Sequence, residues 1–194
     1  MQTTHNTLPE MIRLQSIELL NRHLAAAIDL HGQAKQAHWN VPGPGFIAIH
    51  KLFDRVSEDA EKYSDMLAER VGGLGGTAQG TIQAAVARTF LIAYDLGVAD
   101  EESHIFAVSA ALAAFSQSTR ESISIAKDFG DVVTADMFTE ISRGVDKQLW
   151  FVESHAAPRS PTPNVVEFRL TNPAVSAPTA HAAASGKTMD GMKE

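Results

Sequence analysis

Four long segments of this chain repeat apolar residues every three or four positions, and this period constrains the fold more than any other feature. Each segment has one apolar stripe, and isolated helices are marginal in water, so the four stripes must be buried against one another. Pro9 suits a first helical turn, and the breakers Gly72 and Gly73 close the second segment. We expect helices over residues 9–38, 46–71, 98–127 and 131–155.

The connections between these segments differ in length. Short links join the first segment to the second and the third to the fourth, whereas residues 72–97 form a crossover longer than a bundle usually needs. The middle of the crossover, residues 81–90, has the composition of one short extra helix. The expected fold class is therefore all-α: a ferritin-like four-helix bundle with a short extra helix in the long crossover.

Composition divides the chain and excludes several classes of protein. Five of the eight prolines lie from Pro158 onward, so we expect an N-terminal tail over 1–8, the bundle over 9–157 and a Pro/Ala-rich tail over 158–194. Zero cysteines exclude disulfides and thiolate chemistry, and no apolar run is long enough to span a membrane. Because no secretory signal is evident, we expect a cytoplasmic protein. The net charge of −7 suits cation handling better than general binding of polyanions.

Two histidines and three carboxylates in the first half of the chain form a ligand set suited to ferrous iron, zinc or manganese. They are His38, His50, Asp54, Asp65 and Glu69. On a helical wheel the last four lie almost opposite the apolar stripe, which by itself favours a solvated charged face.

The length of the second segment decides how these residues can meet. At about 1.5 Å per residue, His50 and Asp65 lie about 22 Å apart along a helix, too far to bind one ion within one chain. An antiparallel copy of the same helix, related by a twofold axis near Asp59 and Ala60, would place Asp65 and Glu69 beside the other chain's His50 and Asp54. His38 ends the first helix and would lie nearby. These residues predict a metal site between subunits.

Several runs of the sequence resemble the Dps family, the bacterial mini-ferritins, and the likeness covers roughly residues 15–156. The runs are KQAHWN at 35–40, FIAIH at 46–50, MLAER at 66–70, TAD at 134–136 and DKQLWFVES at 146–154. The resemblance implies a hollow dodecamer built from twofold dimers, which oxidises Fe(II), preferably with hydrogen peroxide rather than O2, and stores ferric oxide inside.

The resemblance also implies which subunit supplies each ligand. His38, His50 and Asp54 would come from one subunit, and Asp65 and Glu69 from its twofold mate. Zinc would be accepted by the same ligands. Such a protein would protect a cell against oxidative stress.

Weaker candidates each have a structural alternative. Trp39, beside His38, is either an electron donor that quenches stray oxidant or a residue packed at a helix end. His31 lies on the stripe of His38, and we expect a hydrogen-bonded core histidine. The single Glu101-x-x-His104 pair is expected to be a helix start, because larger di-iron bundles use two such pairs.

Acidic residues gather around the turn between the third and fourth helices: Asp128, Asp131 and Asp136. In the family, acidic pores admit iron, so these carboxylates are candidate pore residues. The alternative is that these carboxylates only stabilise the N-terminus of the fourth helix, by interacting with its dipole.

Binding of DNA is expected to be weak or absent. The first twelve residues contain no Lys or Arg, and from Pro158 onward four cations stand against three anions, a balance of 4 − 3 = +1. Binding of the phosphate backbone needs several cations. The alternative function is nevertheless a nucleoid-associated protein that compacts DNA, with iron oxidation secondary.

Overall fold

The computed structural model describes residues 3–156; the expected C-terminal tail lies outside the described residues. The described part is all-helical, as predicted, and the ends of the helices lie within three residues of the expected ones. The helices are α1 (Glu10–Asn40), α2 (Phe46–Gly73), α3 (Ile82–Arg88), α4 (Glu101–Phe129) and α5 (Val132–Ala156). No helix in residues 3–156 combines the length and apolarity that crossing a membrane would require.

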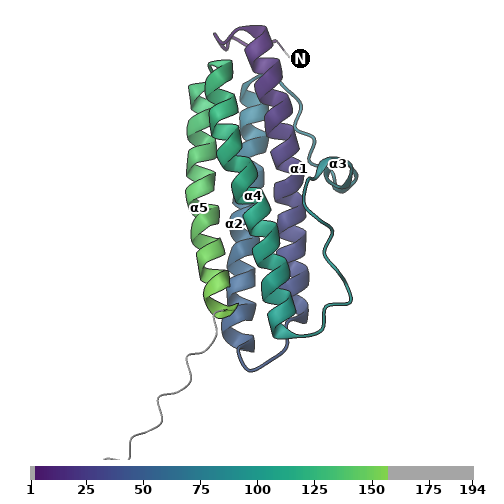
Figure 1. Cartoon of the computed structure of the whole chain (residues 1–194). Helices are drawn as coiled ribbons and strands as arrows, with labels where there is room; N and C mark the ends of the chain where they lie inside the picture. The colour runs from purple at the N-terminus through teal and green to yellow at the C-terminus, as the bar shows by residue number, and fades with distance from the viewer. Residues whose placement is uncertain (1–2, 157–194) are drawn as a thin grey trace, which may run out of the picture. The chain divides into compact units, whose positions relative to one another are not determined.

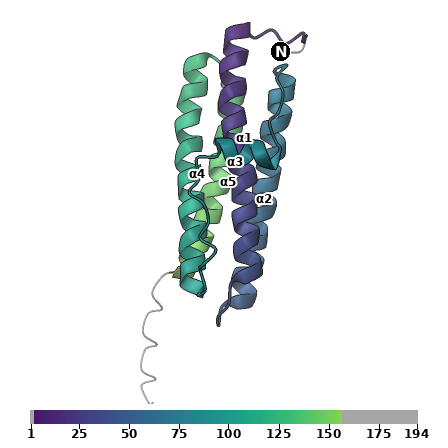
Figure 2. The same ribbon diagram turned by 90° about the vertical axis from the view of Figure 1, so that its right-hand side faces the viewer.

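The four long helices form two antiparallel hairpins that lie side by side (Figure 1). α1 packs mainly on α2, and α4 packs mainly on α5. Because α2 and α4 point the same way, the chain between them must return along the whole bundle, and Figure 2 shows this crossover running over α1 and carrying α3 across it. This topology confirms the predicted ferritin-like bundle with one short helix in its crossover.

The core lies between the two hairpins and is built from the predicted stripes. Phe53, Phe115 and Phe138 are fully buried. Thr81 caps α3 and Asp100 caps α4 with their side chains. Gly130 ends α4 in a left-handed conformation with φ 87°, which a residue with a Cβ adopts only with strain.

A buried histidine links the two hairpins. His23 is 1% exposed and lies edge-on to three phenylalanines. Its Nδ1–H donates to the carbonyl of Leu19 at 2.9 Å, so its Nε2 accepts from the hydroxyl of Ser118 at 3.0 Å. The hydroxyl of Ser122 lies 3.2 Å from the same Nε2 and donates its proton to the carbonyl of Ser118 at 2.8 Å. Burial lowers the pKa of His23, which keeps the ring neutral.

A second buried polar cluster joins the end of α2 to the start of α5. Asp131 is 1% exposed, and Arg70 donates to its carboxylate at 2.8 Å. The same carboxylate accepts from the backbone N–H of Thr134 at 3.1 Å and from its hydroxyl at 2.6 Å. Asp131 therefore caps α5, which agrees with the helix N-terminal alternative. Its carboxylate is bound inside the protomer and is not free to line a pore.

We expect His23→Gln to flatten the pH dependence of stability. In the wild type the unfolded state binds a proton first as the pH falls below about 6.5, so the free energy of unfolding falls by up to about 1.4 kcal/mol per pH unit. Gln has no such ionisation. Urea unfolding at about pH 7.5 and 5.5 checks this, with the exposed His5→Gln as control. An undiminished pH dependence in His23→Gln would contradict the assignment.

We expect Asp131→Ala to lower the free energy of unfolding by about 3 kcal/mol, because it leaves the charge of Arg70 buried without a partner. Asp128→Ala is the matched control, since Asp128 is exposed in the last turn of α4. An acid at that end opposes the helix dipole, so its loss should change stability little. Chemical denaturation of both variants is the measurement, and equal stabilities would refute the structural role of Asp131.

Candidate metal centre

The turn between α1 and α2 places His38 opposite His50. α1 closes with the backbone N–H of Val41 bonded to the carbonyl of Ala37, and α2 begins five residues later, at Phe46. Gly43 makes the reversal with φ 107°, in the region that favours glycine. Because the turn is so short, the last turn of α1 faces the first turn of α2.

The two histidines hydrogen-bond each other's backbone. Nδ1 of His38 lies 2.8 Å from the carbonyl oxygen of His50, and Nδ1 of His50 lies 2.7 Å from that of His38. A carbonyl only accepts, so both Nδ1 atoms carry a proton, and the lone pair of the corresponding tautomer is on Nε2. The rings stack with centroids 3.7 Å apart. Second bonds of this kind orient histidine metal ligands, and both rings are thus prepared for binding through Nε2.

Asp54 lies one helical turn after His50 and completes this half of the site. Its carboxylate is 3.9 Å from Nδ1 of His38 and accepts a hydrogen bond from the ammonium of Lys35. That bond, chiefly, lowers the pKa of Asp54, so the carboxylate is ionised at neutral pH. The bond is not evident from the sequence, although Lys35 lies on the face of α1 that carries His38, three residues earlier.

Asp65 and Glu69 do not join these three residues within the protomer. Both are exposed on α2, further along the same straight helix. In residues 3–156, no three His, Asp or Glu side chains form a group that could hold a metal ion. The structure thus places His38, His50 and Asp54 near one another, as a candidate half-site. Asp65 lies about 16 Å and Glu69 about 22 Å beyond Asp54 along the helix.

The weaker candidate residues differ in exposure and in hydrogen bonding. Trp39 is 68% exposed, so it does not pack within the protomer, and its role as an electron donor stays a prediction. His31 is half-buried, and its Nδ1 lies 2.9 Å from the hydroxyl of Ser57, in agreement with the expected hydrogen-bonded histidine. Asp128 and Asp136 are exposed, and their position at a pore also stays a prediction.

Glu101 and His104 begin α4, as expected. The carboxylate of Glu101 accepts from the backbone N–H of Gly45 at 2.8 Å. His104 is buried, and its Nδ1 lies 2.5 Å from the hydroxyl of Tyr94. Burial lowers the pKa of His104, and Asp100 and the carbonyl of Asn40 act in the opposite direction. Neither residue is close to a second pair of its kind that would make a larger di-iron site.

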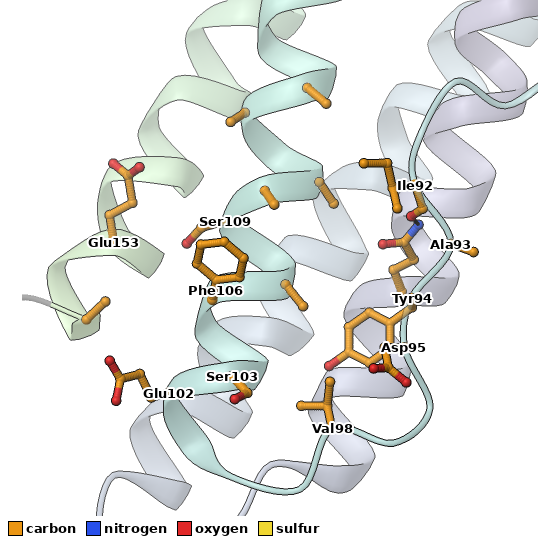
Figure 3. Close-up of a pocket in the computed structure, with 17 residues that line it drawn as sticks. Ile92, Ala93, Tyr94, Asp95, Val98, Glu102, Ser103, Phe106, Ser109 and Glu153 are labelled. Atoms are coloured by element: carbon orange, nitrogen blue, oxygen red, sulfur yellow. Dashed lines mark hydrogen bonds between the residues drawn. The ribbon is translucent and has the colours of Figure 1, made fainter.

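The groove between the crossover and α4 is not the metal centre. It has a volume of about 850 Å³, and Figure 3 shows its lining, with Tyr94 and Val98 on the crossover side and Phe106 on α4. None of the five expected ligands lines it. The candidate ligands His38, His50 and Asp54 therefore lie at the α1–α2 hairpin, outside this groove.

Comparison with known proteins agrees with this fold. The family model for the ferritin-like domain matches residues 17–158. The DNA protection during starvation protein of Agrobacterium fabrum is 41% identical over 157 residues, which are 81% of this chain and 97% of that protein. The protein of the same name from Mycolicibacterium smegmatis is 32% identical over 138 residues, 71% of this chain and 75% of that protein.

Solved structures give the same result. Dps from Mycobacterium smegmatis, in a tetragonal form, has a TM-score of 0.75 at 30% identity, with 80% of this chain and 93% of that chain covered. Dps from Microbacterium arborescens, in the high iron form, has a TM-score of 0.73 at 32% identity, with 79% and 99% covered. With the family model and the relatives in agreement, this chain belongs to the Dps family of ferritin-like proteins.

Proposed function

We propose that this protein is a ferroxidase and iron store, which oxidises Fe(II) with hydrogen peroxide and deposits Fe(III) inside a hollow dodecamer. The observation that carries the proposal is the half-site, in which two imidazoles are held with Nε2 free beside an ionised carboxylate. Neutral imidazoles suit the incoming ferrous ion, and carboxylates favour Fe(III), which promotes loss of an electron.

The reaction balances without releasing a radical. Two ferrous ions give one electron each to one peroxide molecule, its O–O bond breaks, and two protons complete two water molecules. O2 is the alternative oxidant. Zinc would fit the same ligands, but it has no redox chemistry and would act as a competitor.

The rest of the site is supplied by a second subunit in this proposal. The midpoint between His50 and Glu69 in sequence is also the midpoint between Asp54 and Asp65, at Asp59 and Ala60. A twofold axis there would bring Glu69 of one copy near His50 of the other and would make two identical sites. The wide separation of the ligands on one straight helix supports this arrangement.

A second candidate function is binding of DNA, which the name of the relatives suggests. The charges of the chain do not favour it, because the segment 158–194 has a balance of 4 − 3 = +1. Many copies of a weakly cationic tail on one shell would add avidity at low salt. We therefore propose that iron and peroxide removal is the principal activity, with the cytoplasm as its location.

Mixing two inactive variants tests the shared site. His50→Ala and Asp65→Ala should each lose most of their peroxide-dependent Fe(II) oxidation. Refolded together from an equal mixture, they should recover about one quarter of the wild-type sites, because each mixed dimer regains one complete site. Stopped-flow absorbance of the ferric product gives the rates.

The matched control is a mixture of His50→Ala with His38→Ala, whose defects lie in the same half-site. No arrangement of these two chains rebuilds a complete site, so the rate should stay at the level of the single variants. Recovery in this control, or none in the His50→Ala and Asp65→Ala mixture, would contradict a site made by two subunits.

Salt dependence tests the DNA alternative. We expect DNA to be released from the full-length protein at about 0.15 M salt, because few phosphates are neutralised. Gel-shift assays over a salt series, with a variant lacking residues 158–194, provide the measurement. Retention at that salt concentration, abolished by the deletion, would favour the DNA-compacting function instead.

A further inference from the structure

The start of α4 contacts the turn that sets the candidate iron site, although it contributes no ligand. Glu101 and His104 stand out in sequence as a possible metal-binding pair, and the structure uses them differently. The side chain of Glu101 hydrogen-bonds to Gly45, the residue that directly precedes α2 and is its N-cap.

The N-cap residue of α2, Gly45, makes no side-chain cap hydrogen bond, and Glu101 supplies a carboxylate at this position instead. Gly45 has no side chain to accept from the free N–H groups at the start of α2, and no acidic residue occupies its first turn. The carboxylate of Glu101 accepts the N–H of Gly45 at 2.8 Å. A carboxylate there satisfies a free donor and interacts favourably with the helix dipole.

The turn and the Glu101 side chain fit closely together. A Cβ atom on Gly45 would lie 3.0 Å from both carboxylate oxygens of Glu101, and one on Gly43 would lie 3.0 Å from its Cβ and Cδ. Glycine at these two positions therefore allows the approach of Glu101 as well as the positive φ of Gly43.

The α1 end of the same turn, at Asn40, lies near His104, which follows Glu101 on the same face of α4. Asn40, the last residue of α1, is close enough for its carbonyl to influence the ionisation of His104. His104 is held on its other side by Tyr94 of the crossover. The first turn of α4 therefore bonds to Gly45 and lies near Asn40, the residues that flank the reversal.

This placement matters because His38 and His50 depend on the register of α1 against α2. Each ring is oriented by the backbone carbonyl of the other residue, so a shift of one helix along the other would break both bonds. The orientation of the two rings, and with it the position of each Nε2 atom, would then no longer be fixed.

We propose that Glu101 is a positioning residue for the iron site: by capping α2 through Gly45, it holds His50 opposite His38. The inference rests on the proposed function, in that it takes His38 and His50 as ligands. Glu101 fixes the orientation of these two ligands and takes no part in the oxidation step.

Cobalt(II) titration of the assembled protein tests the inference, with the visible absorption band of the bound ion as readout. Glu101→Ala should weaken Co(II) binding about tenfold, the lower end of what loss of an orienting partner costs. Glu101→Asp keeps the charge but is one methylene too short to reach Gly45, so it should be weakened similarly. Glu101→Gln retains an acceptor oxygen at the right length and should bind Co(II) within about twofold of wild type.

Glu102→Ala is the matched control, because it removes the same charge from the same helical turn. Figure 3 shows Glu102 on the opposite side of the start of α4 from Tyr94, and Glu102 is exposed. It should bind Co(II) as wild type does. Size-exclusion chromatography and thermal unfolding accompany each titration, and Glu101→Asp serves if Glu101→Ala does not assemble.

Three outcomes would overturn the inference: unchanged Co(II) affinity in both Glu101→Ala and Glu101→Asp, an equal loss in Glu102→Ala, or no rescue by Gln. Failure of the proposed function has a different signature. In that case wild-type protein would bind Co(II) through His50 and yet fail to oxidise Fe(II) with peroxide.

Discussion

The antiparallel packing of α1 on α2 is the constraint on which the rest of the molecule depends. Five residues reverse the chain between the two helices, so the last turn of one must face the first turn of the other. The hairpin buries the apolar stripes of both helices and at the same time sets His38 against His50. Packing free energy and ligand geometry thus rest on the same contact, and a change that loosens one loosens the other.

The rigidity of α2 has the opposite consequence for the remaining ligands. A single helix of 28 residues carries His50 and Asp54 near its start and Asp65 and Glu69 in its second half. A straight helix cannot bend back on itself, and each additional residue adds about 1.5 Å of separation. One protomer therefore presents a half-site and an exposed pair of carboxylates. Iron chemistry at this site, in the function we propose, depends on assembly.

The polar groups inside the bundle join elements that the apolar stripes only bring near each other. His23 contacts two serines of α4, and the ion pair of Arg70 with Asp131 ties the end of α2 to the start of α5. Buried polar groups without partners are costly, so these contacts penalise any other register of the two hairpins. The same logic places Glu101 at the start of α2, where a free N–H requires an acceptor.

The sequence alone determined the four long helices, the short helix in the crossover and the ferritin-like topology, because apolar period and helix breakers are local signals. It also predicts the five ligands from their spacing. The pairing of those ligands across a twofold axis stays a prediction. Only the tertiary structure decided that His38 and His50 bond each other's backbone, that Asp131 is buried, and that Glu101 caps a helix remote from it in sequence. Helical periodicity tells which face of a helix is buried. It does not tell which polar group that face will meet. Arg70, which binds Asp131, and Gly45, which binds Glu101, each lie more than fifty residues from their partner and are brought to it by packing of the whole bundle.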